Sequence, residues 1–445
     1  MTPSQPIDVQ SVIDNSRLRG FHWLLIVLGF FILAVDGFDT AAMGYIAPSL
    51  SQEWQIARQD LGPVLSAALL GLSFGALGAG PLSDRWGRKR MLVLSCLFFG
   101  LATLATALAS SLTSLTIWRF LTGVGLGAAM PNAITLIAEY APARCRSRVI
   151  NTMYCGFPLG AAAGGAISSW LIPLWGWRSV LLLGAIVPLL LTVLLVIWLP
   201  ESLKFLANRP DQESKMRRIM QRLTQAVIPA HSTFRLQETT AAPRSPVGLL
   251  FSAEYRRGTF MLWTTYFMGL VIYYVLLSWM PTLMQGLGFS MTQSATLTSL
   301  FTFGGTLGIL LAGWMMDRYG AHKVVMVGFA ITAALIVVMA REDHHIVMLG
   351  AAIFLVGITM NGAQSGMQTL AATFYPTQAR ATGIAWMQGV GRFGGVSGTL
   401  MAAHIMAMGW SVQSLLLSLC LPALVAAVAI MLKRRSPQAL ALESK

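Results

Sequence analysis

Two acidic residues interrupt an apolar stretch near the start of the chain. In AVDGFDTAAM, Asp36 and Asp39 stand three residues apart, with LLIVLGFFIL before them and GYIAPSL after them. Side chains at this spacing lie on one face of a helix. Two carboxylates that close, away from water, do not both ionise easily, so we expect one to hold a proton near neutral pH. The pair therefore predicts a proton-binding site, unless one Asp only pairs with a basic residue or caps a helix break at Gly37.

Two arginines also lie within apolar runs. Arg119 begins the segment RFLTGVGLGAAMPN, and Arg392 lies in GVGRFGG. A charge at the middle of a bilayer costs at least about 2.5–3.5 kcal/mol, so such residues face the protein interior and indicate function. Because a guanidinium matches a carboxylate, Arg119 is a candidate partner for Asp36 or Asp39, for a ligand carboxylate, or for a purely structural ion pair. Arg392 is a candidate for a ligand carboxylate or for a gate near the inner end of its helix.

A stripe of amides follows in another apolar segment. Asn361, Gln364 and Gln368 are spaced by three and four residues, so they share one helical face. A polar stripe in a membrane helix must face protein or a cavity. The stripe therefore predicts either hydrogen bonds that hold helices together or a binding wall with amide donors.

The composition indicates that membrane-spanning helices position these residues. Of 445 residues, 55% are hydrophobic and 11% are charged, whereas soluble domains carry about 25% charged residues. Apolar runs of about 20 residues predict membrane spans. The first run is too long for a signal-peptide core, and no small-residue cleavage site follows it. Twelve runs are present, at 23–47, 60–80, 91–110, 114–138, 148–170, 179–199, 258–281, 294–315, 323–341, 346–371, 382–407 and 411–432.

The basic residues are concentrated on one side of the predicted membrane. The net charge is +14. With the N terminus inside, the external loops hold only Arg58, Arg178 and Arg341 among the 31 Lys and Arg. This is the positive-inside pattern. It predicts that both termini are cytoplasmic, and it explains the excess charge without a nucleic-acid partner.

The chain contains an internal repeat. GPLSDRWGRKR, which starts at Gly80, is followed by a weaker copy, GWMMDRYGAHK, which starts at Gly313. YAPARCR and FYPTQAR match at nearly the same offset. We therefore expect an all-α membrane protein with twelve transmembrane helices in two pseudo-symmetric six-helix bundles, a known transporter plan. The expected parts are a cytoplasmic N-terminal segment (1–22), two bundles (23–199 and 258–432), a cytoplasmic linker (200–257) and a cytoplasmic tail (433–445).

These motifs resemble those of the major facilitator superfamily. GPLSDRWGRKR is similar to its signature loop, and RFLTGVGLGAAMPN and LPES are similar to two of its other motifs. DGFDTAAMGYIAP, YFMGL, NGAQS and FYPTQARATG resemble the aromatic acid:proton symporter family, and most of all its 4-hydroxybenzoate and protocatechuate members. The resemblance extends from about residue 20 to 435.

The resemblance implies import of an aromatic carboxylate together with protons across the bacterial inner membrane, by alternating access and as a monomer. It assigns proton coupling to Asp36, Asp39 and Arg119. Aromatic side chains opposite the amide stripe would suit a flat ring, although packing is an equal alternative for them. The candidate substrate-binding residues are Tyr266, Phe267, Tyr273, Asn361, Gln364, Gln368, Trp386 and Arg392.

The repeated loops are candidates for a cytoplasmic latch. Acidic and basic residues at the helix ends are expected to hold that side shut in one state and to separate in the other. The second latch should be weaker, because GAHK replaces GRKR. The candidate gating residues are Asp84, Arg85, Arg88, Glu139, Arg144, Asp317, Arg318, His322 and Arg380.

Other classes of function have little support. The sequence contains no HExxH, P-loop or Cys/His cluster, so we expect no enzyme activity, cofactor or metal. Three alternatives stay open. The substrate could be another acid, such as benzoate, 3-hydroxybenzoate, gentisate, vanillate, muconate or a chlorinated aromatic acid. Transport could instead be proton-driven efflux, or the protein could be a transporter-like sensor.

Overall fold

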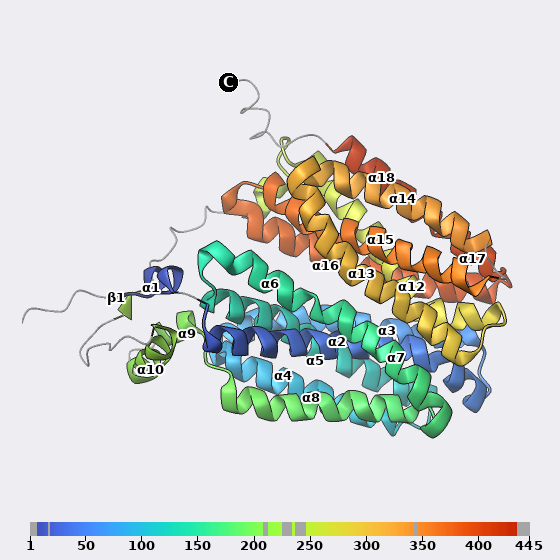
Figure 1. The fold of residues 1–445 in the computed structure, drawn as a ribbon, viewed down its shortest axis with the longest axis horizontal. Coiled ribbons are helices and arrows are strands. Elements are labelled where there is room, and N and C mark those ends of the chain that lie inside the picture. The colour runs from blue at the N-terminus through green and yellow to red at the C-terminus, as the bar shows by residue number, and fades with distance from the viewer. Residues whose placement is uncertain are drawn as a thin grey trace, which may run out of the picture. The chain divides into compact units, whose positions relative to one another are not determined.

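The computed structural model describes residues 7–16, 18–207, 212–224, 234–235, 246–341 and 345–433, and this part of the chain is almost entirely helical (Figure 1). The first half contains α2 (Gly20–Trp54), η1 (Arg58–Leu61), α3 (Gly62–Trp86), α4 (Arg88–Ala107), α5 (Leu112–Tyr140), η2 (Ala143–Cys145), α6 (Arg146–Tyr154), α7 (Gly156–Trp175) and α8 (Arg178–Trp198). The second half contains α12 (Arg256–Gly286), α13 (Met291–Tyr319), α14 (Ala321–Arg341), α15 (Ile346–Phe374), α16 (Thr377–Ala407), α17 (Val412–Ser418) and α18 (Cys420–Leu432). The N-terminal segment and the linker contribute β1 (Ile7–Asp8), α1 (Val9–Asn15), α9 (Leu203–Ala207), α10 (Glu213–Thr224), β2 (Phe234–Arg235) and α11 (Pro246–Leu250).

All twelve predicted runs coincide with helical segments, whose ends differ from the predicted ones by up to seven residues. Two of the runs are divided into two helices each, α6 with α7 and α17 with α18. Within the described residues, eleven helices are long and apolar enough to cross a membrane. The remaining run lies in α16, which carries Gln388, Arg392 and His404 and is less apolar than most of the long helices. The expected fold class, an all-α membrane protein with twelve transmembrane helices, is confirmed.

The two signature loops make the same turn. Gly87, between α3 and α4, has a φ of 95°, and Gly320, between α13 and α14, has a φ of 83°. Residues with a Cβ rarely adopt this conformation, so glycine is needed at both positions. Because Gly87 and Gly320 are equivalent in the sequence repeat, the shared turn supports the duplication.

The chain forms two compact units. The first contains Met1–Gly37, Gly71–Gly160 and Leu181–Ala241, and the second contains Phe38–Leu70, Ala161–Val180 and Ala242–Lys445. Several first-half helices, α2 among them, therefore contribute one end to each unit. The two six-helix halves, 23–199 and 258–432, stay a prediction.

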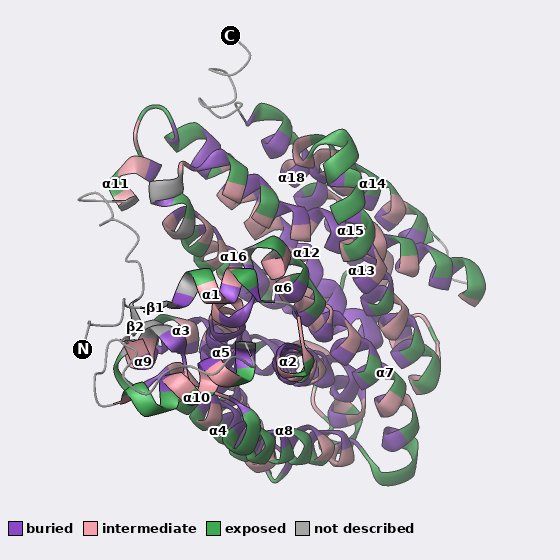
Figure 2. Ribbon diagram, turned by 60° about the vertical axis from the view of Figure 1, so that its left-hand side comes forward, coloured by how far each residue is buried: buried purple, intermediate pink, exposed green. Residues whose placement is uncertain are grey.

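The first unit has an apolar core that extends beyond the membrane helices. Side chains of α2, α4, α5 and α6 form its main part, and α1, α9 and α10 continue it at the end where the chain begins (Figure 1). We call these three short helices the cap. The helices of both units carry buried and exposed faces (Figure 2), and many exposed side chains are large and apolar, as expected for lipid contact.

Candidate functional site

Asp36 and Asp39 lie in the middle of α2, and both are buried. Asp36 is 2% exposed and Asp39 is 1% exposed. Because α2 is continuous from Gly20 to Trp54, neither residue caps a helix break, and that alternative is wrong. Close packing explains the glycine at position 37, because a Cβ on Gly37 would overlap the backbone of Phe157 in α7. The acids therefore lie on an intact helix that packs closely on its neighbour.

Arg119 lies in α5 and is 1% exposed, which makes it one of the largest fully buried side chains. It belongs to the same compact unit as Asp36. Helix α4 lies close to both Asp36 and the helix of Arg119. Its Cys96 is within electrostatic range of Asp36, and its Phe99 packs on Gly125 of α5. An acidic and a basic side chain are thus buried in one helix group, where an ionised form of either needs polar neighbours to offset its lost hydration.

The second unit brings four of the predicted substrate residues together. The Gln364 Nε2 donates to the Tyr266 carbonyl, and the Gln368 Nε2 donates to the Tyr266 hydroxyl, each at 3.4 Å. The ring of Tyr266 lies against Gly391 of α16, and Arg392 is within electrostatic range of Tyr266. We call Tyr266, Gln364, Gln368 and Arg392 the tyrosine–amide cluster.

One acceptor of the cluster lies against Gly269 of α12. The Oε1 of Gln364 is buried and makes no hydrogen bond to any part of the chain that the structure describes. A buried acceptor without a partner is costly. A hydroxyl group of a bound molecule would satisfy it. A ligand hydroxyl would reach this oxygen only if the Gln364 side chain turned away from Gly269.

The remaining predicted substrate residues lie in other surroundings. Asn361 donates to the carbonyl of Gly357, one turn earlier in its own helix, at 3.0 Å. Tyr273 is buried and packs edge-on against Tyr274, with ring centroids 5.2 Å apart. Trp386 is 44% exposed and stacks on Trp263, and the backbone of Phe267 lies against Gly394. These contacts favour packing over ligand binding for these residues.

The first latch contains a charge network that extends into the linker. Arg88 forms an ion pair with Glu139 at 3.3 Å, and Glu139 also accepts a hydrogen bond from the hydroxyl of Ser202 at 2.6 Å. Glu201 accepts from the backbone N–H of Lys89 at 2.9 Å. Glu201 and Ser202 were not among the predicted latch residues, although both belong to the LPES motif. The side chain of Asp84 lies outside the described residues.

The second latch is more open. Asp317, Arg318 and Arg380 are exposed, and the guanidinium of Arg318 lies 5.9 Å from the ring centroid of Trp314. His322 shares a hydrogen bond with the Ile430 carbonyl at 2.8 Å. In the first half, Arg85 is exposed and Arg144 donates to the carbonyl of Ser16 at 2.6 Å.

A buried lysine lies beside the FYPTQAR motif and was not predicted. The Nζ of Lys433 lies 4.5 Å from the ring centroid of Phe374, which packs against Tyr255 and Tyr375. Burial lowers the pKa of Lys433 to about 8. The sequence gives little indication that Lys433 is buried, because it is one of three consecutive basic residues, KRR, at the start of the tail.

Helices of the two halves also meet inside the second unit, near Trp54 and Gly286. We call this the outer end, because the charge pattern predicts it to be external. Arg58 of η1 donates to the carbonyl of Thr282 in α12 at 3.3 Å. A Cβ added to Gly44 of α2 would lie 2.7 Å from the carbonyl oxygen of Leu277 and 2.8 Å from that of Ser278. The backbones of α2 and α12 are therefore in direct contact.

Comparisons with known proteins agree with this architecture. The model of the Major Facilitator Superfamily matches residues 29–297 and 262–445. The 4-hydroxybenzoate transporter PcaK of Pseudomonas putida is 47% identical over 428 residues, which cover 96% of each chain. The gallate transporter of Pseudomonas putida is 43% identical and covers 96% of this chain and 95% of its own. The crystal structure of a D-xylose-proton symporter superposes with a TM-score of 0.74 at 17% identity, over 94% of this chain and 98% of that one.

Proposed function

The chain belongs to the major facilitator superfamily, and from that premise we propose that it imports an aromatic carboxylic acid together with protons across the bacterial inner membrane. The best candidates for the substrate are 4-hydroxybenzoate and protocatechuate. The proposal includes a monomer, cytoplasmic termini and two six-helix halves that alternate around a central site.

The observation that carries the proposal is the burial of Asp36 and Asp39 on an unbroken helix. Both are almost inaccessible, and they stand three residues apart. At that spacing a single proton relieves the repulsion between two carboxylates. Arg119, buried in the same unit as Asp36, would stabilise the ionised form after the proton leaves. The pair can therefore take up and release a proton within the membrane.

The tyrosine–amide cluster is the proposed substrate site. Arg392 would bind the carboxylate, because a guanidinium matches it in shape and charge. The oxygen of Gln364 and the donors of Gln368 and Tyr266 would recognise a ring hydroxyl. The relatives named for 4-hydroxybenzoate and gallate support a hydroxylated ring acid.

The energetics favour a coupled proton. An aromatic acid is an anion at neutral pH, and bringing one negative charge into a cell against 100 mV costs about 2.3 kcal/mol. One proton that enters with the anion cancels the charge movement and adds the energy of the pH gradient. A protonatable pair in the path would serve this coupling, and Asp36 and Asp39 provide it.

The test compares two kinds of transport in proteoliposomes. Asp36→Asn and Asp39→Asn should abolish uptake driven by a pH gradient, because neither variant can cycle a proton through the pair. Exchange of labelled for unlabelled substrate needs no net proton movement and should survive, at least in part, in one of them. Asp60→Asn, at an exposed aspartate, is the control. If both buried variants accumulate substrate as well as the wild type does, the acids are structural.

A further inference from the structure

The beginning of α2 holds a buried histidine that the proposed transport cycle does not use. His22 is 3% exposed. Its Nδ1 accepts a hydrogen bond from the backbone N–H of Arg19 at 3.2 Å. Its Nε2 makes no hydrogen bond within the described part of the chain. A ring nitrogen that accepts carries no proton, so His22 is neutral in this structure.

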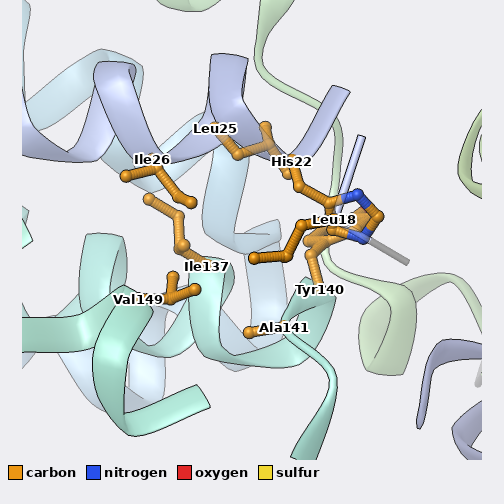
Figure 3. A pocket seen from close by; sticks show the side chains of 8 residues that line it. All are labelled: Leu18, His22, Leu25, Ile26, Ile137, Tyr140, Ala141 and Val149. Atoms are coloured by element: carbon orange, nitrogen blue, oxygen red, sulfur yellow. The ribbon is translucent and has the colours of Figure 1, made fainter. Parts of the chain in front are cut away.

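The surroundings of His22 are apolar. The ring lies beside a small cavity whose walls are mostly aliphatic side chains from α2, α5 and α6 (Figure 3). Tyr140 is the other polar residue in the wall, and its hydroxyl donates to the Glu201 carbonyl. The cavity therefore provides little to stabilise a cation, and an ion there pays a large desolvation cost.

The charged groups nearby do not offset a positive charge on His22. Arg19, whose N–H the ring accepts, has the same sign. The carboxylates on the neighbouring elements already have partners. Glu139 pairs with Arg88 and accepts a hydrogen bond from Ser202. Asp14 pairs with Arg146 at 3.8 Å. Tyr140 and Arg148 also lie at this end of α5 and α6, and Arg144 and Glu201 lie in the segments that follow α5 and α8; farther along α2, α5 and α6 are Asp36, Asp39, Arg119 and Tyr154.

The hydrogen bond to Arg19 defines how α2 begins. Arg19 precedes the first residue of α2, and His22 is the third residue of the helix, so its side chain accepts from the N–H of the residue that begins the helix, as in a capping box. A protonated ring has two donors and no acceptor. It would lose this bond and place a positive charge at a helix N-terminus, where the helix dipole is also positive.

We propose that His22 is a proton-operated switch that holds the cap in place at neutral pH and releases it when the cytoplasm becomes acidic. The chain connects His22 to the cap directly, because α1 ends four residues before Arg19. Arg144 holds the Ser16 carbonyl, and Val9 and Ile13 of α1 are buried in the same apolar core as Met216 and Met220 of α10. Loss of the first turn of α2 therefore loosens the chain that anchors α1.

The role of the switch rests on the proposed function. An importer that brings protons in with each substrate acidifies the cytoplasm, and release of the cap would slow it. The switch itself does not depend on transport. Its failure and the failure of the proposed function are therefore distinguishable in a measurement that involves no substrate.

The measurement is hydrogen exchange of peptides that cover residues 7–20 in the purified full-length protein, at pH 7.5 and 5.5, corrected for the intrinsic pH dependence. While the cap is docked, the ring of His22 excludes the proton. Once the cap is released, His22 takes up the proton at the ordinary histidine pKa of about 6.5. Docking is thus complete above that pH and is lost below it. Protection should fall about tenfold between pH 7.5 and 5.5, because each pH unit below the pKa weakens docking tenfold.

Two substitutions separate the switch from a structural role. In His22→Asn, the side-chain oxygen replaces Nδ1 as an acceptor and does not titrate, so protection should be equal at both pH values. In His22→Phe, the volume is kept and the acceptor is lost, so protection should be low at both. Peptides from α14 serve as the internal control. If protection in the wild type does not change with pH, or if the Asn variant loses it as the wild type does, the switch does not exist.

Discussion

We expect closure of the outer end to depend on Gly44, which lies at the contact of α2 with α12. We expect Gly44→Ala to destabilise every state in which this end is closed. The added Cβ would lie 2.7 Å and 2.8 Å from two backbone oxygens of α12 and 3.1 Å from the Cα of Ser278. Because these atoms are backbone, no side-chain rotation relieves the overlap, and the two helices must separate.

The magnitude follows from the cost of overpacking. One extra methyl group in a packed interior costs about 1–3 kcal/mol. A state that is open at the outer end lacks this contact, so the added methyl group does not destabilise it. Since about 1.4 kcal/mol is a factor of ten, the ratio of open to closed molecules should rise by about five- to 150-fold. Uptake should slow, because each cycle requires the closed state.

The assay is labelling of a cysteine by an impermeant maleimide added outside intact cells. Ser49→Cys is suitable because Ser49 is half-buried at the outer end of α2, and the four native cysteines are replaced first. Gly44→Ala should increase the labelling rate of this cysteine. Gly78→Ala is the matched control, because no atom lies within 4 Å of the Cβ that it adds.

Two results would refute the reasoning. The contact of α2 with α12 does not limit closure if Gly44→Ala leaves the labelling rate and the uptake rate unchanged. An equal increase in Gly78→Ala would mean that any added methyl group loosens the protein, and that the close backbone approach at Gly44 has no special role.

Three further predictions concern other parts of the molecule. Glu139→Gln removes the charge that pairs with Arg88, so substrate exchange should slow several-fold while the equilibrium affinity in binding assays stays the same; a tenfold loss of affinity at a normal exchange rate would contradict this. Lys433→Met should raise the melting temperature in detergent at pH 7, because a buried ammonium is removed and the packing on Phe374 is kept. In the wild type, the folded pKa of about 8 lies below the ordinary 10.5, so stability should rise by up to about 3 kcal/mol between pH 8 and 10.5, and the Met variant should not show this rise. Gln368→Leu should raise the half-saturation concentration for 4-hydroxybenzoate about tenfold and that for benzoate much less, since only the former has the hydroxyl group; equal changes for both acids would place Gln368 outside the site.

The sequence was sufficient for the helices because their signal is local. Apolar runs of about 20 residues need no knowledge of tertiary contacts. The repeated signature loop was also visible in the sequence, and Gly87 and Gly320 have the same backbone conformation in its two copies. The alternative that an Asp caps a helix break at Gly37 was wrong, because α2 is continuous there. Glycine in a sequence suggests a break, whereas this one allows close approach of α7.

Contacts between side chains were harder to predict. Periodicity placed Asn361, Gln364 and Gln368 on one face, yet only the two glutamines reach Tyr266, while Asn361 bonds within its own helix. A glutamine side chain is one methylene longer than that of asparagine, and the pattern contains no information on which neighbour lies within reach. The roles of Glu201 and His22 depend in the same way on segments distant in sequence.

The two latches differ in a way that has a physical consequence. In the first, the carboxylate side chain of Glu139 is 6% exposed, so its ion pair with Arg88 is poorly screened by salt and costly to break without a replacement partner. In the second, Asp317 and Arg318 are exposed, and exposed pairs are worth about 1 kcal/mol or less. The two loops therefore share one backbone turn, and we expect the first to hold more strongly than the second. Opening at the cytoplasmic side is expected to depend mainly on Glu139 and its hydrogen bond from Ser202, and high salt should leave the transport rate largely unchanged.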